Sequence, residues 1–440
     1  MTSTVKETNY SATVRHILDQ TDEASWLKIM RECAIERFSE LGFPTPADED
    51  WKYTNVAPLA TENFDLAIEA TAVDREKFAQ FAASEMNASR LVFVNGKLNA
   101  DLSDVSTLSA SSAAVLNLAE AVKDERFAEI IKQNLARVVD YNKNGFTALN
   151  TAVQTDGAFV FVPKNTKIET PIQLLFVASG ESIAAFPRVL VVLERGAEAT
   201  IVESYLRTGE TKYFTNSVVE IVLADDARLT HTRIQRESHA AFHVTTTGAR
   251  LQRGSFYDST NITLGGKLSR HDINVKFYAE GAEAFVDGLY LISESQHADT
   301  HSIIDHAVPN CLSHQNYKGI VDERARAVFN GKVFVRENAS GTNAQQSNKN
   351  LLLSNDARVD TKPQLEIFND DVKCAHGATV GQLEEEELFY LLSRGLKEEL
   401  ARNLLTYGFA EEIINKIKIE SIKEQLDEAV LNRLHANLAA

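Results

Sequence analysis

A four-residue pattern that recurs through the middle of the chain limits its fold more than any other feature. Each copy has a small or charged residue, then alanine, then a charged residue and an apolar one. Single copies are expected by chance, because alanine and charged residues are common, but the pattern occurs six times, with alanines 30, 22, 33, 43 and 32 residues apart. A turn followed by a strand, repeated at a loose period, indicates a solenoid. The copies are Gly196–Ala199, Asp226–Leu229, Gly248–Leu251, Gly281–Ala284, Arg324–Ala327 and Asp356–Val359.

The repeated region is rich in β-branched residues, which favours a β-helix or an elongated β-sandwich. The flanking sequence has helical spacing instead. From Ser25 to Leu41 apolar residues recur every three or four positions until Gly42 ends the pattern, and residues 111–140 repeat such spacing.

We therefore predict a mainly β fold with helical flanks, in three parts. Residues 1–155 form a mostly helical N-terminal domain, residues 156–376 a β-helix core, and residues 377–440 a helical, partner-binding C-terminal domain. The segment from Leu383 to Leu434 is amphipathic. It is expected to cap an open strand edge of the solenoid, to dock a partner protein, or to do both.

The charge and the cysteines exclude several classes of protein. A net charge of −17 argues against binding to nucleic acid or to an anionic membrane surface. Cys33, Cys311 and Cys374 are widely separated and do not form a disulfide framework, which indicates a reducing, cytoplasmic location. No export signal and no membrane-spanning apolar run is evident.

The residues with the clearest chemistry are Cys374 and His376, in the segment Lys-Cys-Ala-His-Gly-Ala-Thr. Both side chains are metal ligands of intermediate softness. The preceding residues, 363–372, have the composition of extended chain. In a strand, residues i and i+2 share a face and lie about 6.6 Å apart, so both side chains could reach one metal ion or cluster. A surface cysteine and histidine at a strand end is the simpler alternative.

A second group of histidines is less suited to metal binding. His297 and His301 would share a strand face but lie about 13 Å apart, and His306 would face the other way. With His314, these residues are expected at polar ladder and turn positions.

No nucleotide-binding loop is present. The closest match to a Walker A motif is Gly265-Gly266-Lys267-Leu268-Ser269, with Asn261 in place of the first glycine. Any ATP-driven step must therefore use another chain. An iron–sulfur cluster takes about four protein ligands, mostly thiolates. One thiol and one imidazole cannot complete such a site, so a cluster held at Cys374 and His376 must be shared with a second protein or be transient.

Four blocks of sequence resemble the SufB/SufD family of scaffold subunits in SUF iron–sulfur cluster assembly. The strongest is Lys373–Gly381, followed by Leu388–Gly395, with Glu49–Thr54 and Asn316–Gly319 in support. The SufB branch typically has His-Glu-Ala where this chain has His-Gly-Ala, and its chains tend to be longer. Both differences favour the SufD branch.

The resemblance implies a right-handed parallel β-helix between helical domains, with no catalytic activity in this chain alone. It implies a SufB-like scaffold as partner, a SufC-like ATPase bound by the C-terminal helices, and a homodimer when the partner is absent. The family's functional histidine falls on His376, beside Cys374. No cofactor would be bound stably by this chain, but a transient iron–sulfur cluster or iron would form at the shared interface.

Two enzymatic alternatives remain open at this point. Cys374 could be a nucleophile with His376 as its base, although strand neighbours about 6.6 Å apart rarely come within hydrogen-bond reach. A carbohydrate-active β-helix would need paired carboxylates on one face, for which Asp360, Glu366, Asp370 and Asp371 are candidates.

Overall fold

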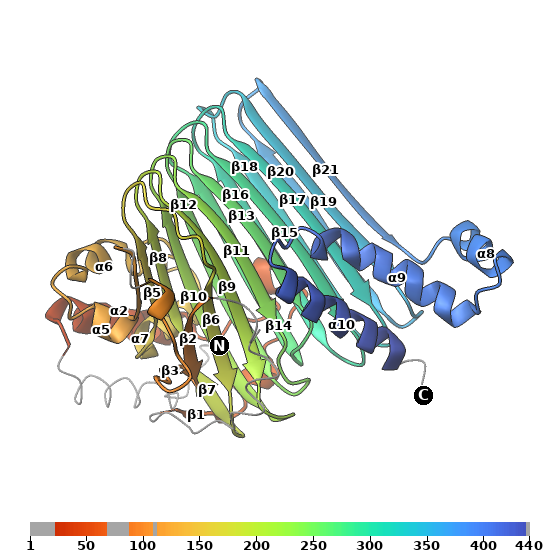
Figure 1. The fold of residues 1–440 in the computed structure, drawn as a ribbon, viewed down its shortest axis with the longest axis horizontal. Coiled ribbons are helices and arrows are strands. Elements are labelled where there is room, and N and C mark those ends of the chain that lie inside the picture. The colour runs from red at the N-terminus through yellow and green to blue at the C-terminus, as the bar shows by residue number, and fades with distance from the viewer. Residues whose placement is uncertain (1–22, 68–87, 109–111, 437–440) are drawn as a thin grey trace.

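The computed structural model describes residues 23–67, 88–108 and 112–436. Its centre is a parallel β-solenoid in which each turn adds one strand to each of two facing sheets (Figure 1). The β20 sheet contains β5 (Gly157–Val162), β8 (Arg188–Leu193), β10 (Tyr213–Leu223), β12 (Phe242–Leu251), β14 (Leu268–Phe277), β16 (His297–His306), β18 (Arg326–Val335) and β20 (Arg358–Ile367). The β21 sheet contains β6 (Ile172–Ala178), β9 (Glu198–Arg207), β11 (Arg228–Gln235), β13 (Phe256–Thr263), β15 (Glu283–Ile292), β17 (Leu312–Val321), β19 (Thr342–Leu352) and β21 (Val372–Gly381).

Helices and short strands flank the solenoid at both ends of the sequence, which confirms the predicted fold class. The N-terminal elements are α2 (Ser25–Leu41), the 3₁₀ helix η1 (Glu49–Trp51), α3 (Ala57–Ala60), β1 (Asp65–Leu66), β2 (Ser89–Val94), β3 (Lys97–Leu98), the 3₁₀ helix η2 (Ser106–Leu108), β4 (Ala114–Asn117), α5 (Leu118–Ala121), α6 (Ala128–Asn134) and α7 (Gly145–Val153). The short strand β7 (Ile183–Ala185) lies between β6 and β8, and the chain ends in α8 (Glu385–Ser393), α9 (Glu398–Ile414) and α10 (Glu420–Ala436).

The repeated alanine pattern marks the turns that lead into strands. Ala197, Ala227, Ala282 and Ala325 each directly precede a strand and are fully buried. Ala357 does the same before β20. Small side chains fit here because the tight turn places these alanines in the solenoid interior. The copy at Gly248–Leu251 differs from the others: it forms the end of β12 rather than a turn that leads into a strand.

The interior of the solenoid is divided lengthwise into an apolar and a polar half. The apolar half is a continuous core that includes Leu229, Leu251 and Phe277. The polar half is lined by buried side chains from alternate strand positions. Glu203 bonds to His231 at 3.0 Å, and His231 bonds to Tyr257 at 3.1 Å. We call this half the polar column. It is built from residues such as His231, Arg233 and Gln235, Ser259 and Asn261, Gln315, Gln346 and Asn348.

The N-terminal region contributes strands as well as helices. Within residues 111–140, where helical spacing was predicted, residues 114–117 form β4, which pairs antiparallel with β5. β2 pairs parallel with β6 and extends the other sheet. These strands lie at the end where the solenoid begins and continue its sheets. Parts of the predicted domain, residues 1–22, 68–87 and 109–111, lie outside the described residues.

The block Glu49–Thr54 fastens the N-terminal region to the outer face of the β20 sheet. The guanidinium of Arg270 lies 3.7 Å from the centre of the buried Trp51 ring. Arg270 also forms an ion pair of 2.8 Å with Asp299, which accepts a hydrogen bond from the hydroxyl of Thr54. Lys362 of β20 pairs with Glu49 at 2.6 Å.

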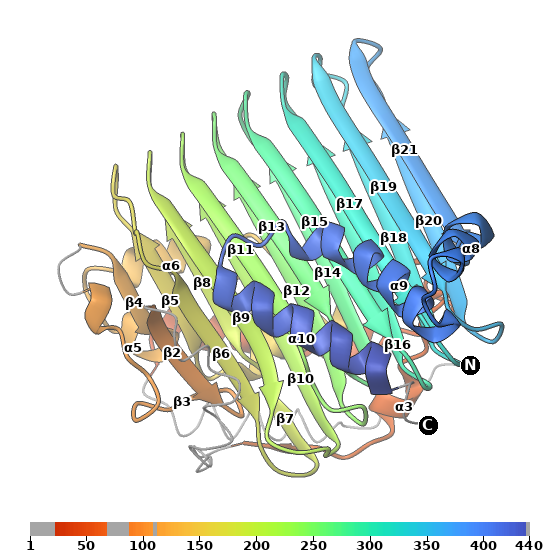
Figure 2. The ribbon, with the colours of Figure 1, turned by 45° about the vertical axis from the view of Figure 1, so that its right-hand side comes forward.

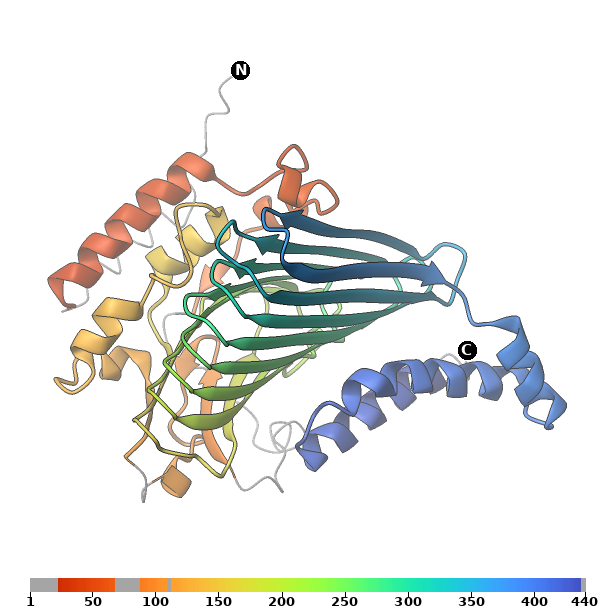
Figure 3. The ribbon, with the colours of Figure 1, turned by 90° about the horizontal axis from the view of Figure 1, so that it is seen from above.

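The C-terminal helices do not cap the end of the solenoid, contrary to one expected role. α9 and α10 lie along the outer face of the β21 sheet, while α2 lies on the opposite side of the molecule (Figures 2 and 3). Their buried residues, including Ile413 and Leu426, pack on outward-facing apolar residues of several strands. Burial of this apolar face explains why the helices pack on the side of the solenoid. The strand partners are Val202, Ile234, Ile262, Leu289, Leu291 and Ile320.

Polar contacts hold this helix pair in place. Lys318 of β17 forms an ion pair with Glu412, and its ammonium lies 4.3 Å from the centre of the Phe409 ring. Asn316, two residues earlier on the same outer face, donates a hydrogen bond of 3.0 Å to Glu412. Along the described ranges of the chain, none of the helices is long and apolar enough to cross a membrane.

Candidate functional site

The predicted ligand pair lies on the last strand of the solenoid. Cys374 and His376 are both within β21, which pairs only with β19 among the described strands. Their register partners are Ala344 and Gln346. The extended conformation expected from the sequence is therefore confirmed, and the two side chains share the face that points toward the solenoid interior. Whether they bind a metal or cluster remains a prediction.

Cys374 is half-buried at the open end of the solenoid, where β20 and β21 are the last described strands of their sheets. It packs against Val333, Val335 and Ala344. Burial raises the pKa of the Cys374 thiol, although a hydrogen bond involving the backbone of Ala344 acts in the opposite direction. The thiol is thus protonated at neutral pH, and binding a metal ion would release its proton. A raised pKa is the opposite of what activates a cysteine nucleophile, so the environment of Cys374 argues against the hydrolase alternative.

His376 is exposed at the mouth of the polar column. Its register partner Gln346 is only 3% exposed, and the next side chain inward, Gln315, is also buried. A side chain at position 376 therefore continues a line of interior polar groups to the surface. The imidazole has no protein partner on its outer side in the described part of the chain, which leaves it accessible to a ligand or a second protein.

The other histidines singled out from the sequence are occupied by protein partners. His297 bonds to Thr54 at 2.8 Å, and His301 to Asp299 at 3.1 Å. His306 bonds to Ser313 at 2.8 Å inside the solenoid, and His314 faces Asp287 at 3.9 Å. These positions agree with the predicted ladder and turn roles. Among the described residues, no group of three or more His, Cys, Asp or Glu side chains is arranged to hold a metal ion.

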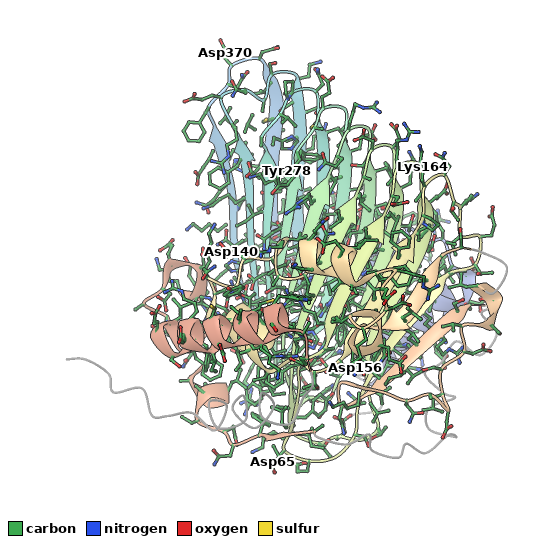
Figure 4. All side chains as sticks on the ribbon, turned by 90° about the vertical axis from the view of Figure 1, so that its left-hand side faces the viewer. Asp65, Asp140, Asp156, Lys164, Tyr278 and Asp370 are labelled. Atoms are coloured by element: carbon green, nitrogen blue, oxygen red, sulfur yellow. The ribbon has the colours of Figure 1, made fainter. Side chains whose placement is uncertain are left out.

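The carboxylates proposed for a carbohydrate-active site are not paired with one another. Asp360 forms an ion pair with Arg326 at 2.6 Å, and Glu366 with Lys332 at 3.3 Å. Asp370 and Asp371 lie in the turn between β20 and β21, and Figure 4 shows Asp370 at the tip of the solenoid. Asp360 and Glu366 lie six residues apart on one strand, about 20 Å, which is too far for a pair of glycosidase carboxylates.

The polar column itself was not anticipated from the sequence. Oε2 of Glu237 lies 2.6 Å from Nδ1 of His243, and Arg233 donates to the other ring nitrogen of His243 at 2.6 Å. Burial raises the pKa of Glu237, but the contacts with His243 outweigh it and the pKa lies below its usual value. The available signal was the alternation His231, Arg233, Gln235 within one predicted strand, which places three polar residues on one face.

A second candidate surface lies on the C-terminal helices. None of the residues of α8 is buried, and Phe389 and Tyr390 are 72% and 56% exposed. On α9, Leu400 and Leu404 are each 50% exposed. We call these four residues the α8–α9 apolar patch. Clustered exposed aromatic and leucine side chains are typical of protein-binding surfaces.

Two family models match almost the whole chain. The SufBD core domain of the SUF iron–sulfur cluster assembly system matches residues 176–409, which is more than half of the chain and contains both Cys374 and His376. The SufBD N-terminal region matches residues 6–174. The chain belongs to the SufBD family. The resemblance inferred from the sequence blocks is thereby confirmed.

Curated relatives support the same assignment of this SufBD protein. An iron–sulfur cluster assembly SufBD family protein of Synechocystis is 40% identical over 420 residues, covering 93% of this chain and 91% of the relative. The iron–sulfur cluster assembly protein SufD of Escherichia coli is 30% identical over 405 residues, covering 91% of each chain. SufD of Bacillus subtilis is 28% identical over 416 residues, covering 93% of this chain and 94% of the relative.

Proposed function

We propose that this chain is a non-catalytic scaffold subunit that builds iron–sulfur clusters at a site shared with a homologous, SufB-like subunit. The observation that carries the proposal is the position of Cys374 and His376 on a terminal strand whose outer edge has no partner among the described strands. Two ligands fall short of the roughly four that a cluster needs. The cluster or iron is cargo, held transiently by ligands from both subunits.

The open end of the solenoid suits pairing with a second solenoid. Both β20 and β21 end their sheets, so each presents a row of unpaired backbone groups. Strands of a partner could add to these edges and bring their own ligands next to His376. A second copy of this chain could occupy the same edges when the SufB-like partner is absent, giving a homodimer.

A SufC-like ATPase is the partner we assign to the α8–α9 apolar patch. The chain has no nucleotide loop of its own, so the energy source must dock from outside. α9 and α10 are held on the solenoid by the apolar cluster around Leu426, whereas α8 has no buried residue. α8 is therefore free to fit into a partner. The three-subunit assembly would work in the cytoplasm.

The shared site is tested by His376→Ala in the complete complex. Cluster assembly should fall sharply while folding and partner binding persist, because His376 is exposed. His239→Ala is a control, since His239 is a partly exposed histidine on a loop, where it contacts Glu294 and Glu210. Unchanged cluster assembly in the His376 variant would refute the proposal.

Pairing at the open end is tested by crosslinking from Cys374. Cys33 is exposed and would react as well, so the experiment uses a Cys33→Ser background, and Cys311 is buried. A thiol-specific crosslinker should capture the SufB-like subunit, and native mass measurement should give the same hetero-assembly. Capture of only a second copy of this chain in the intact complex, or free reaction with bulky reagents, would contradict the shared site.

ATPase docking is tested by point substitution rather than by deleting the tail, because deletion would expose the apolar face beneath α9 and α10. Phe389→Asp should weaken co-purification of the ATPase but not of the SufB-like scaffold. Ile29→Asp on α2 is the control, because Ile29 is similarly exposed, at 59%, on the opposite side of the molecule. Undiminished ATPase capture by the Phe389 variant would disprove docking at this patch.

A further inference from the structure

Gln346 lies directly behind His376 in the polar column. The two residues are register partners on neighbouring strands, about 4.8 Å apart, and their side chains point to the same interior face. Gln346 is 3% exposed, and its Oε1 atom has no hydrogen-bond partner within the described structure. A buried amide oxygen without a partner is costly. The register partner of Gln346 toward the open end is His376, on the last described strand of this sheet.

The orientation of the Gln346 amide is fixed from the inside. Its Nε2 atom donates to Oε1 of Gln315 at 3.3 Å. The same Oε1 atom accepts from the hydroxyl of Ser302, on the opposite sheet, at 2.7 Å. In this arrangement Gln315 offers an acceptor, and Gln346 directs its NH₂ group inward toward it. The hydrogen-bond chain from Ser302 through Gln315 to Gln346 thus ends in the amide oxygen of Gln346, on the strand next to His376.

A glycine on the facing sheet makes room for this amide. A Cβ atom at Gly331 of β18 would lie 2.8 Å from Cδ of Gln346 and closer still to its Nε2. The phenyl ring of Phe329 would be 2.8 Å from the same Cβ. The absence of a side chain at position 331 therefore leaves the space that the Gln346 amide occupies.

We propose that Gln346 is a positioning residue for His376: its amide oxygen accepts one ring N–H of His376 and leaves the other ring nitrogen free to bind iron or a cluster. The inference rests on the proposed function only for the identity of what is bound. Histidine ligands commonly donate their second N–H to a carbonyl, which fixes both the tautomer and the ring orientation. Forming this bond requires the exposed His376 side chain to rotate toward its register partner Gln346.

The test reads the tautomer of His376 directly by long-range ¹⁵N–¹H spectroscopy of the full-length, ¹⁵N-histidine-labelled chain. The His376 signal is assigned by its loss in His376→Ala. In the native protein one tautomer should predominate. Gln346→Met keeps the length of the side chain but removes the acceptor, and should shift the tautomer ratio roughly fivefold. Gln346→Glu keeps an acceptor oxygen and should retain the native tautomer.

Identical His376 ¹⁵N shifts in the native protein and in Gln346→Met would overturn the inference. The signals of the other histidines report whether the variant is folded. If it is not, Gln346→Asn serves instead, because it withdraws the oxygen by one methylene and should also mix the tautomers. The spectrum is recorded without metal or partners. If Gln346→Met shifts the tautomer ratio but the complex with His376→Ala still assembles clusters normally, the proposed function is refuted and this inference stands.

Discussion

Tyr290 and Gly319 are register partners on β15 and β17, and the tyrosine ring lies over the glycine. A Cβ atom at position 319 would be 2.6 Å from Cζ of Tyr290 and closer to Cε2. The neighbouring pair repeats the arrangement in reverse, with Tyr317 over Gly288. Each glycine admits an aromatic ring into a narrow interior, which is how two large side chains fit on adjacent turns.

Gly319→Ala should therefore destabilise the protein by about 1–3 kcal/mol, the usual effect of overpacking a core. The free energy of unfolding would be measured by urea denaturation. Gly408→Ala in α9 is the control, since nothing lies within 4 Å of a Cβ added there. The control should be neutral or slightly stabilising. Equal stability of the Gly319 variant and the native protein would show that Tyr290 can move aside.

The sequence predicted the class of fold because the turns carry a local signal. A small residue directly before a strand, as at Ala227 and Ala325, is a consequence of turn geometry and can be read without knowing the partners of the strand. The pairing of Cys374 with His376 was likewise local, since strand alternation alone places them on one face. The side of the solenoid that the C-terminal helices cover was not predictable, because it depends on outward apolar residues such as Ile234 and Leu289 in distant strands.

The polar column escaped prediction for a related reason. A strand containing His231 and Arg233 would ordinarily expose them on a polar face, and only closure of the solenoid makes that face internal. Similarly, nothing near Gln346 in the sequence indicates Gly331 or Gln315 as its neighbours. Contacts between turns depend on register, and the register is set by all the turns together.

Glu220 of β10 anchors the segment 136–139 to the solenoid. Its carboxylate is fully buried, pairs with Arg188 at 2.6 Å, and accepts backbone N–H groups of all four residues at 2.8 to 3.1 Å. Glu220→Gln would leave Arg188 without its charge partner. It would also point the NH₂ group of the new amide at backbone N–H groups of segment 136–139, which are donors themselves. We expect a loss of about 3–5 kcal/mol in the free energy of unfolding.

Glu169→Gln is the control for this substitution, because its ion pair with Lys167 is largely exposed and worth little. Urea denaturation would compare the two variants. A loss of less than about 1 kcal/mol for Glu220→Gln would mean that the segment 136–139 can satisfy its N–H groups in another way.

His306 should make stability depend on pH in the acid range. Burial lowers the pKa of this imidazole to about 4, compared with about 6.5 in an unfolded chain. Between these values the unfolded state binds more protons than the folded state, so stability falls as the pH is lowered from 6.5 to 4. The full effect of this one group is about 3 kcal/mol.

His306→Gln should make the free energy of unfolding depend less steeply on pH between 6.5 and 4, with His239→Gln as the control substitution at a less buried histidine. Denaturation at several pH values measures the slope. An unchanged slope in the His306 variant would indicate that other buried histidines, such as His271, whose pKa burial also lowers, account for the acid sensitivity.

Lateral docking of α10 can be distinguished from an end cap by one pair of leucines. Leu426 is fully buried against the β21 sheet, whereas Leu431, on the same helix, is 37% exposed. Leu426→Ala should cost about 2–5 kcal/mol and speed amide hydrogen exchange in β11 and β13, whose outward residues Ile234 and Ile262 it covers. Leu431→Ala should change neither. Faster exchange confined to β21, at the open end, would instead place the helix over the edge of the solenoid.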